Sequence, residues 1–328
     1  MKWWALFAVL LGLAVGGATA YLTRDSGDAG VRPGAPMRAV VSIAPLKGLI
    51  EPLLPEGAEV VVLIPPGVSE HGYELRPGDA AALARADVVA IVGLGLEPRI
   101  EQILERRPRE GRLTLVMGDM LGIVGDGHDH GHDHSAHAHD CGLCAHGTDP
   151  HLWLDPVLTR QFVERAAGAM ASELRARGLA GEADGVLERG RALARRIDEM
   201  HESYASRLAP AAGSAIVTHH AAWGRLADRY GLVQAAVVRP IESAEPTPSE
   251  IADAVRAIEE RGAKVLFIEP QFSDRGARRL AERTGIRVGQ LDPLGGGDWF
   301  AMMGENLREL ERLLVPEGQR VGASGGSR

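Results

Sequence analysis

The sequence predicts an α/β protein of two lobes, each with a central, mostly parallel four-stranded sheet flanked by helices. Two observations support this fold class. Strand-like apolar runs alternate with helix-like segments, and this alternation occurs once in each half of the chain. Alternating strands and helices imply βαβ units with parallel strands. A third observation, a long helical stretch between the halves, predicts that one long rigid helix joins the lobes.

Eight short segments are the strand candidates. The four in the first half are apolar runs rich in Val and Ile, which is typical of strands buried on both faces of a parallel sheet. These strands are expected at 39–43, 60–64, 88–92, 113–116, 215–218, 233–238, 265–268 and 287–290. Helices are expected between them, at 46–54, 79–85, 98–106, 222–230, 249–260, 275–283 and 299–314.

The segment between the halves, roughly residues 156–208, has a helical pattern that Gly178 and Gly181 interrupt. Its last 26 or so residues would span about 39 Å at 1.5 Å per residue, long enough to run along both lobes. The resulting organisation is an N-terminal lobe, a linking helix, a C-terminal lobe and a disordered tail. Their expected bounds are 38–181, 182–209, 210–316 and 317–328.

Residues 1–20 are typical of a secretory signal peptide. Lys2 precedes an apolar run from Trp3 to Val15, and an Ala-Thr-Ala cleavage sequence ends at Ala20. The apolar run is short for a membrane span, which needs about 20 residues, although an N-terminal membrane anchor remains the alternative. Residues 21–37 are polar and rich in Gly and Pro, which predicts a disordered tether. We therefore expect a periplasmic protein.

A histidine-rich loop at 127–146 holds seven of the chain's 12 histidines, and such tracts bind metal by composition. The loop histidines, which we interpret as an auxiliary metal site, are His128, His130, His132, His134, His137, His139 and His146. Both cysteines of the chain, Cys141 and Cys144, lie in this loop. A disulfide and a metal site remain open for them. The net charge of −8 and the lack of a basic stripe argue against a nucleic-acid partner.

Four further candidate metal ligands are dispersed along the chain at turns that can follow strands. In open α/β sheets, ligands bind beyond the carboxyl ends of the strands, so these residues can meet in the cleft between the lobes. Three histidines and one carboxylate suit tetrahedral zinc. The four candidates are His71, His151, His220 and Asp292.

Other residues close to these candidates in the sequence have separate interpretations. His219 precedes His220, and adjacent side chains point differently, so we expect only one of them to bind metal. Glu269 ends a predicted strand and could be a ligand or a partner that orients an imidazole. Asp155 and Asp298 are interpreted as helix caps.

Six segments together resemble the metal-binding solute receptors of bacterial ABC transporters, specifically the zinc branch. The resemblance covers roughly residues 38–315, in the family's order. It rests on the segments EHGYELRPGDAAALARADVVAIVGLGLE, DPHLWLDP, THHAAWGRLADRYGL, AEPTPSEI, LFIEPQFS and LDPLGG. It implies two (β/α)₄-type lobes joined by one rigid helix, with the metal between them.

The resemblance also implies the ligand set. His71 matches the family's H-x-Y motif, and His151 matches D-P-H-x-W. His220 matches the histidine four residues before Gly224, and Asp292 matches D-P-L-G. Some zinc receptors carry a disulfide in the second lobe, and this chain has no cysteine there, so the family gives no role for its C-x-x-C motif.

From the resemblance we expect a monomeric zinc receptor that captures Zn²⁺ and delivers it to a membrane permease, and we expect no enzymatic activity. Manganese-type relatives tend to carry Glu at the position of His220, so His220 favours zinc. Three alternatives stay open. They are a manganese or iron receptor of the same fold, a zinc hydrolase with Glu269 as its general base, and a zinc buffer that acts through the loop alone.

Overall fold

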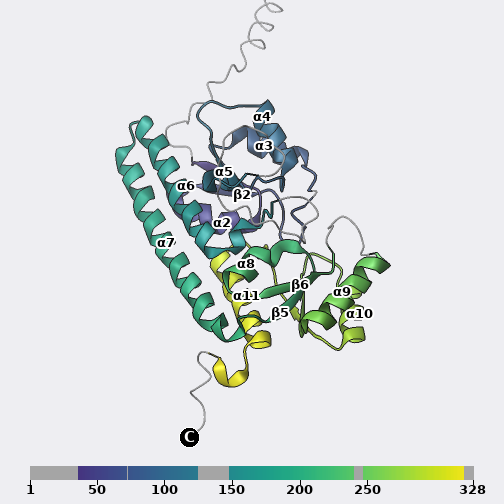
Figure 1. Ribbon diagram of the computed structural model, residues 1–328. Coiled ribbons are helices and arrows are strands. Elements are labelled where there is room, and N and C mark those ends of the chain that lie inside the picture. Colours follow the sequence, from purple (N-terminus) through teal and green to yellow (C-terminus); the bar gives the residue numbers. More distant parts are fainter. Residues whose placement is uncertain (1–35, 72, 125–147, 240–246, 321–328) are drawn as a thin grey trace, which may run out of the picture. The chain divides into compact units, whose positions relative to one another are not determined.

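Two parallel four-stranded sheets form the framework of the protein (Figure 1). The computed structural model describes residues 36–71, 73–124, 148–239 and 247–320, which belong to one compact unit. The predicted signal peptide, the tether up to residue 35, the histidine-rich loop and its two cysteines lie outside the described residues. In the part of the chain that is described, no helix combines the length and the apolar character that a membrane span requires.

The first sheet has the strand order β2-β1-β3-β4, and all its pairs are parallel. Its two inner strands are nearly or completely buried, whereas the outer two are half exposed, as expected when helices cover both faces of a parallel sheet. We call this sheet with its helices the N-lobe. Its strands are β1 (Arg38–Val41), β2 (Glu59–Val62), β3 (Val88–Ile91) and β4 (Leu113–Val116).

The second sheet repeats the pattern with the order β6-β5-β7-β8, again entirely parallel. It forms the C-lobe with its own helices. Its strands are β5 (Ala215–Thr218), β6 (Val233–Val237), β7 (Val265–Ile268) and β8 (Arg287–Gln290). The predicted fold class is therefore confirmed, and each of the eight predicted strands is present.

The remaining elements connect the strands and cover the sheets. In the N-lobe they are α2 (Ala44–Ile50), η1 (Glu51–Leu53), α3 (Pro77–Arg85), α4 (Pro98–Arg106), α5 (Met117–Leu121) and η2 (Leu152–Leu154). In the C-lobe they are η3 (Ala209–Ala211), η4 (Ala221–Trp223), α8 (Gly224–Arg229), α9 (Pro248–Arg261), α10 (Arg275–Thr284), α11 (Trp299–Leu314) and η5 (Glu317–Gln319).

A pair of long helices, α6 (Pro156–Ala176) and α7 (Ala180–Leu208), links the lobes, and Figure 1 shows them side by side. Gly178 adopts a left-handed conformation with φ of 78° at the turn between them. Arg189 of α7 donates to the carbonyl of Leu53 in the N-lobe at 2.9 Å. Farther along, the Tyr204 hydroxyl donates to the carbonyl of Met303 in the C-lobe at 2.8 Å. The linking helix thus bonds to both lobes.

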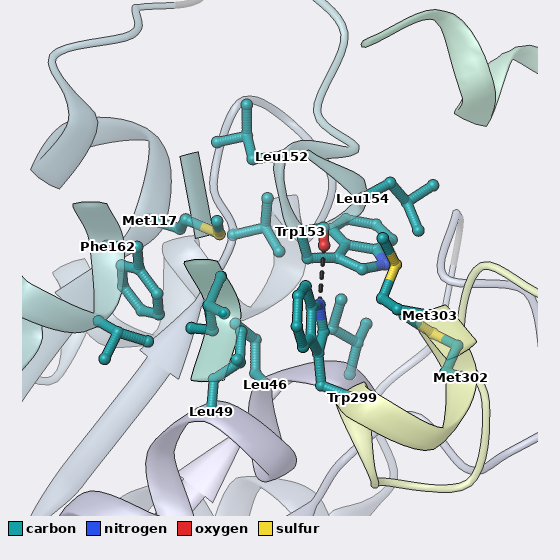
Figure 2. Close-up of a cluster of buried hydrophobic side chains, with 14 of the residues drawn as sticks. Leu46, Leu49, Met117, Leu152, Trp153, Leu154, Phe162, Trp299, Met302 and Met303 are labelled. Atoms are coloured by element: carbon teal, nitrogen blue, oxygen red, sulfur yellow. Dashed lines mark hydrogen bonds between the residues drawn. The ribbon is translucent and has the colours of Figure 1, made fainter. Parts of the chain in front are cut away.

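The lobes also share a large hydrophobic core, part of which is shown in Figure 2. Trp299 at the start of α11 donates from its indole nitrogen to the carbonyl of Trp153 at 2.8 Å, the dashed line in the figure. Trp153 in turn donates to the carbonyl of Pro293 at 2.6 Å. A Cβ atom at Gly48 of α2 would lie 2.6 Å from the backbone nitrogen of Trp299. The two lobes are therefore closely packed.

Two features differ from the sequence-based expectation. The short helix α5 was not predicted, because five residues are too few to show a helical period. Residues 317–320, expected in the disordered tail, instead form the turn η5 and continue to Arg320. The Arg320 side chain donates to the carbonyls of Val315 and Arg312 at 3.1 and 3.0 Å, which ties this turn to the end of α11.

Candidate metal site

Three imidazole rings from separate parts of the chain meet at the carboxyl ends of the sheets. His71 lies in the loop after β2, His151 precedes η2, and His220 follows β5. The Nε2 atom of His151 lies 3.3 Å from that of His71 and 3.2 Å from that of His220. The structure therefore brings together three of the four ligands predicted from the sequence.

A buried carboxylate orients the His151 ring. Its Nδ1 atom lies 2.8 Å from Oδ1 of Asp149, and the same oxygen accepts the backbone N–H of His151 at 2.9 Å. A carboxylate can only accept, so Nδ1 carries the ring proton of the neutral imidazole. The Nε2 atom then keeps its lone pair, which points toward the other two rings. This Asp–His arrangement is typical of metal-binding histidines.

The His220 ring is oriented in the same way from the C-lobe. Its Nδ1 atom forms a short hydrogen bond with Oε2 of Glu269, the residue directly after β7. The indole N–H of Trp223 donates to the second oxygen of Glu269 at 3.0 Å, which holds that carboxylate in place. Glu269 is fully engaged in positioning the imidazole, so the structure favours the orienting role over that of a ligand.

The fourth donor in the cluster is Glu70, which sequence reasoning missed. Its side chain is 1% exposed, and among the described residues neither of its oxygens has a hydrogen-bond partner. Oε1 lies 3.6 Å from Nε2 of His151. Ligand atoms of Glu70, His71, His151 and His220 all lie within 4.8 Å of one another. A buried carboxylate without a hydrogen bond is costly, and a cation at the centre of the cluster would compensate it.

The spacing of the donors fits tetrahedral zinc. Zinc lies about 2.0–2.1 Å from histidine nitrogens, so two such ligands of a tetrahedral ion are roughly 3.3 Å apart. The observed Nε2 separations of 3.2 and 3.3 Å match this value. A hard cation such as Mg²⁺ or Ca²⁺ prefers an all-oxygen shell, which three imidazoles do not provide.

Burial and charge shift the pKa values of the cluster in opposite directions. Burial lowers the pKa of His71 to about 3, assisted by the neighbouring His151. Burial would also lower the pKa of His151, but the carboxylates of Asp149 and Glu70 outweigh it and raise that pKa to about 10. Burial would raise the pKa of Glu70, yet the nearby imidazoles lower it to about 2. Without metal, the cluster thus holds a proton at His151 between buried carboxylates.

The other predicted residues lie outside this group of four donors. Oδ1 of Asp292 accepts hydrogen bonds from Gln271 at 2.6 Å and from the backbone of Leu294 at 3.0 Å, and its role as a ligand stays a prediction. The His219 ring stacks edge-on against Phe272. The auxiliary site formed by the histidine-rich loop falls outside the described residues.

The helix-cap interpretation is confirmed for two aspartates near the site. Asp155 accepts the backbone N–H of Val157 at 2.8 Å at the start of α6. Asp298 accepts the backbone N–H groups of Phe300 and Ala301 at the start of α11. Neither carboxylate is a member of the donor cluster.

Two parallel-sheet lobes that direct imidazoles to one point at their junction define a metal-binding α/β protein. The family model described as zinc-uptake complex component A, periplasmic (ZnuA), matches residues 39–313. The chain belongs to this family. The family resemblance inferred from the sequence motifs is therefore confirmed.

Among curated relatives, the zinc-binding protein AdcA of Streptococcus pyogenes serotype M3 is 25% identical over 301 residues, covering 87% of this chain and 57% of AdcA. The chain thus spans little more than half the length of these AdcA relatives. A putative metal-binding protein of Treponema pallidum is 28% identical over 283 residues, covering 84% of this chain and 83% of that protein.

Solved structures share the fold. A crystal structure of ZnuA superposes with a TM-score of 0.69 at 23% identity, covering 86% of this chain and all of the other. The periplasmic zinc-binding protein TroA of Treponema pallidum gives a TM-score of 0.72 at 19% identity, with 86% and 100% coverage. At these identities the similarity establishes the fold alone.

Proposed function

We propose that this protein is a zinc receptor that captures Zn²⁺ outside the inner membrane and releases it to the permease of an ABC transporter. The observation that carries the proposal is the convergence of three histidine Nε2 atoms at spacings that fit tetrahedral zinc. Buried carboxylates fix the orientation of two rings, so their Nε2 atoms already face the site before metal arrives.

We assign the ion to His71, His151 and His220, with Glu70 completing a tetrahedral shell from the donor cluster. Asp292, expected as the fourth ligand, lies close to the same edge of the C-lobe sheet but accepts hydrogen bonds from Gln271 and Leu294. A comparison of variants at Glu70 and Asp292 decides between the two carboxylates.

Localisation and partners belong to the same proposal. The family description includes the word periplasmic, and a relative in Streptococcus pneumoniae is named a zinc-binding lipoprotein. Both names agree with the secretory pattern of residues 1–20. We propose a periplasmic monomer whose partners are the zinc ion and a membrane permease.

The test is metal analysis of protein purified without added metal, followed by zinc titration against a competing chelator. The proposal predicts one tightly bound zinc per chain at the histidine cluster. Titration of a variant without residues 127–146 separates this ion from any ions held by the loop histidines.

A manganese or iron receptor is the nearest alternative function. It is favoured by one observation, the oxygen donor Glu70 beside the imidazoles, because manganese accepts carboxylate ligands readily. A solved structure with the same fold is described as the solute-binding protein FpvC of Pseudomonas aeruginosa with Mn²⁺, at a TM-score of 0.69 and 22% identity. Competition between zinc and manganese at equal free concentrations distinguishes the two receptors.

A zinc hydrolase is the less favoured alternative. Catalytic zinc keeps an open coordination position and needs a nearby general base. Four protein donors would fill a tetrahedral shell, and Glu269 is engaged by His220 and Trp223. These contacts support a binding protein over an enzyme. A zinc-bound water with only three protein ligands would favour the hydrolase.

A further inference from the structure

We propose that Arg225 is a positioning residue that tightens zinc binding through Asp149 and thereby links the His151 segment to the C-lobe. This inference rests on the proposed function as a zinc receptor. Arg225 lies on α8, the short helix that begins four residues after His220. It touches no member of the donor cluster in any described contact.

The contacts of Arg225 converge on one residue. Its Nε and Nη2 atoms donate to the backbone carbonyl of Asp149 at 3.0 and 2.7 Å. Nε also lies 3.7 Å from Oδ2 of the Asp149 carboxylate. Arg225 is 8% exposed and Asp149 is 2% exposed, so both charges are withdrawn from water. Removal of one partner from such a buried pair is strongly destabilising, because the other charge is left buried without compensation.

Asp149 connects Arg225 to the metal site through its hydrogen bonds to His151. The carboxylate oxygen Oδ1 holds both the backbone N–H and the Nδ1 atom of His151. The other oxygen, Oδ2, faces Arg225 and Gly224 on α8. A small displacement of Asp149 would therefore rotate the His151 ring and misdirect its Nε2 lone pair. Partners that orient a metal-binding histidine typically contribute tenfold to a hundredfold in affinity.

The arrangement spans the two lobes. Asp149 and His151 belong to the segment that leads into α6, whereas α8 follows His220 in the C-lobe. Arg225 therefore links the segment that contains His151 to α8, the helix that follows His220 in the C-lobe. No contact of this kind reaches His71 from Arg225 among the described residues, because His71 lies in the loop after β2.

Arg229 provides a matched control one turn further along α8. Its guanidinium contacts the carboxylate of Asp155 at 2.7 to 3.1 Å, again between the C-lobe and the segment before α6. Asp155 caps α6 and makes no described contact with a ring of the cluster. Loss of Arg229 should therefore affect the packing of the segment without turning the His151 ring.

The test compares Arg225→Met and Arg229→Met in the full chain by zinc competition against a chelator. We expect Arg225→Met to weaken zinc binding by about tenfold and Arg229→Met to leave the affinity unchanged. Thermal unfolding measures the stability of each variant. Arg225→Lys, which keeps the charge but offers fewer donors, should recover part of the affinity and carries the test if the Met variant does not fold.

Two readouts distinguish positioning from a general structural role. In the zinc complex, the Nδ1–H proton of His151, followed by NMR, should exchange faster with water in Arg225→Met than in Arg229→Met. In an Asp149→Ala background, Arg225→Met should cause a smaller loss of affinity than in the parent protein, because the carboxylate that holds the His151 ring is already removed.

Equal affinities of Arg225→Met and the parent protein, or the same loss with and without Asp149, would overturn the role of Arg225 while leaving the zinc site intact. Failure of the parent protein to bind zinc tightly would instead overturn the proposed function, and the inference with it.

Discussion

The Nε2 atom of His151 in the N-lobe lies 3.2 Å from the Nε2 atom of His220 in the C-lobe, and the opposite nitrogen of each ring faces a buried carboxylate. When both rings are neutral, two lone pairs point at each other across this distance. That arrangement is unfavourable unless a cation lies between them. Either a proton or a metal ion can fill this role, so the two compete for one site.

This competition predicts how zinc affinity depends on pH. The carboxylates of Asp149 and Glu70 raise the pKa of His151 to about 10, so the metal-free site carries a proton at neutral pH. Zinc must displace that proton, and its affinity should rise about tenfold per pH unit up to the pKa of His151. His71, whose pKa burial lowers to about 3, is already neutral and adds nothing above that pH.

Chelator competition from pH 6 to 9 on protein lacking residues 127–146 measures this slope. Titration calorimetry in buffers of different ionisation enthalpy counts the released protons, which should be close to one per zinc. Three independent imidazoles with ordinary pKa values near about 6.5 would behave differently. Such imidazoles would give a flat zinc affinity above about pH 7.5 and would release up to three protons per zinc below about pH 6. That result would contradict a proton held at His151 in the metal-free site.

The neighbouring histidines His219 and His220 should differ sharply in their effect on zinc. Only His220 directs Nε2 into the donor cluster, whereas the His219 ring packs edge-on against Phe272. His220→Ala should weaken zinc by more than about a hundredfold, because a direct ligand contributes more than the partners that orient it. His219→Ala is the matched control and should retain most of the affinity. Equal losses in the two variants would show that the register is wrong.

Glu70 and Asp292 are the two candidates for the oxygen ligand, and a matched pair of substitutions separates them. Glu70→Gln and Asp292→Asn each remove a charge while preserving shape. Glu70 lies with the imidazoles and lacks a hydrogen-bond partner among the described residues, so its substitution should lower zinc affinity by about tenfold to a hundredfold. Asp292→Asn should have the smaller effect, measured by the same titration. The reverse order would assign the ligand to Asp292.

The close packing of α2 against α11 predicts a large stability effect at a single glycine. A Cβ atom at Gly48 would lie 2.6 Å from the backbone nitrogen of Trp299 and 2.9 Å from the carbonyl of Gly297. Backbone atoms cannot rotate away, so Gly48→Ala should lower the free energy of unfolding by about 1–3 kcal/mol.

Gly168 in α6 is the control, because nothing lies within 4 Å of a Cβ atom there. Gly168→Ala should raise the free energy of unfolding by about 0.5–1 kcal/mol, as expected in a helix interior. Urea denaturation measures both variants. A neutral effect of Gly48→Ala would mean that the lobes are packed less tightly than the structure shows.

Much of the fold could be predicted from the sequence because its signals are local. Strands such as β3 and β7 are fully buried and consist of continuous apolar residues. The helix α7 shows a helical period over many turns, and its observed start at Ala180 differs by two residues from the predicted one. Helix α5 was missed because its five residues leave no period to detect.

The sequence predicted the three histidines of the candidate site and Glu269 as a partner that orients an imidazole, but not Glu70, Asp149 or Arg225. Glu70 directly precedes His71, and adjacent residues carry no spacing signal that would place both side chains in one cluster. Asp149 stands two residues before His151, the spacing of a turn in which Asp bonds to the backbone, and this was the available clue. Arg225 offered no clue, because its contact with Asp149 joins residues 76 positions apart.

The most direct test of the zinc site is a zinc titration, against a competing chelator, of the chain without residues 127–146. The donor cluster predicts one tight equivalent of zinc in this variant, and His151→Ala in the same background should abolish it. The loop histidines cannot supply such a site once they are removed. A loop-deleted protein without a tight zinc ion would contradict the assignment of His71, His151 and His220 as the receptor site.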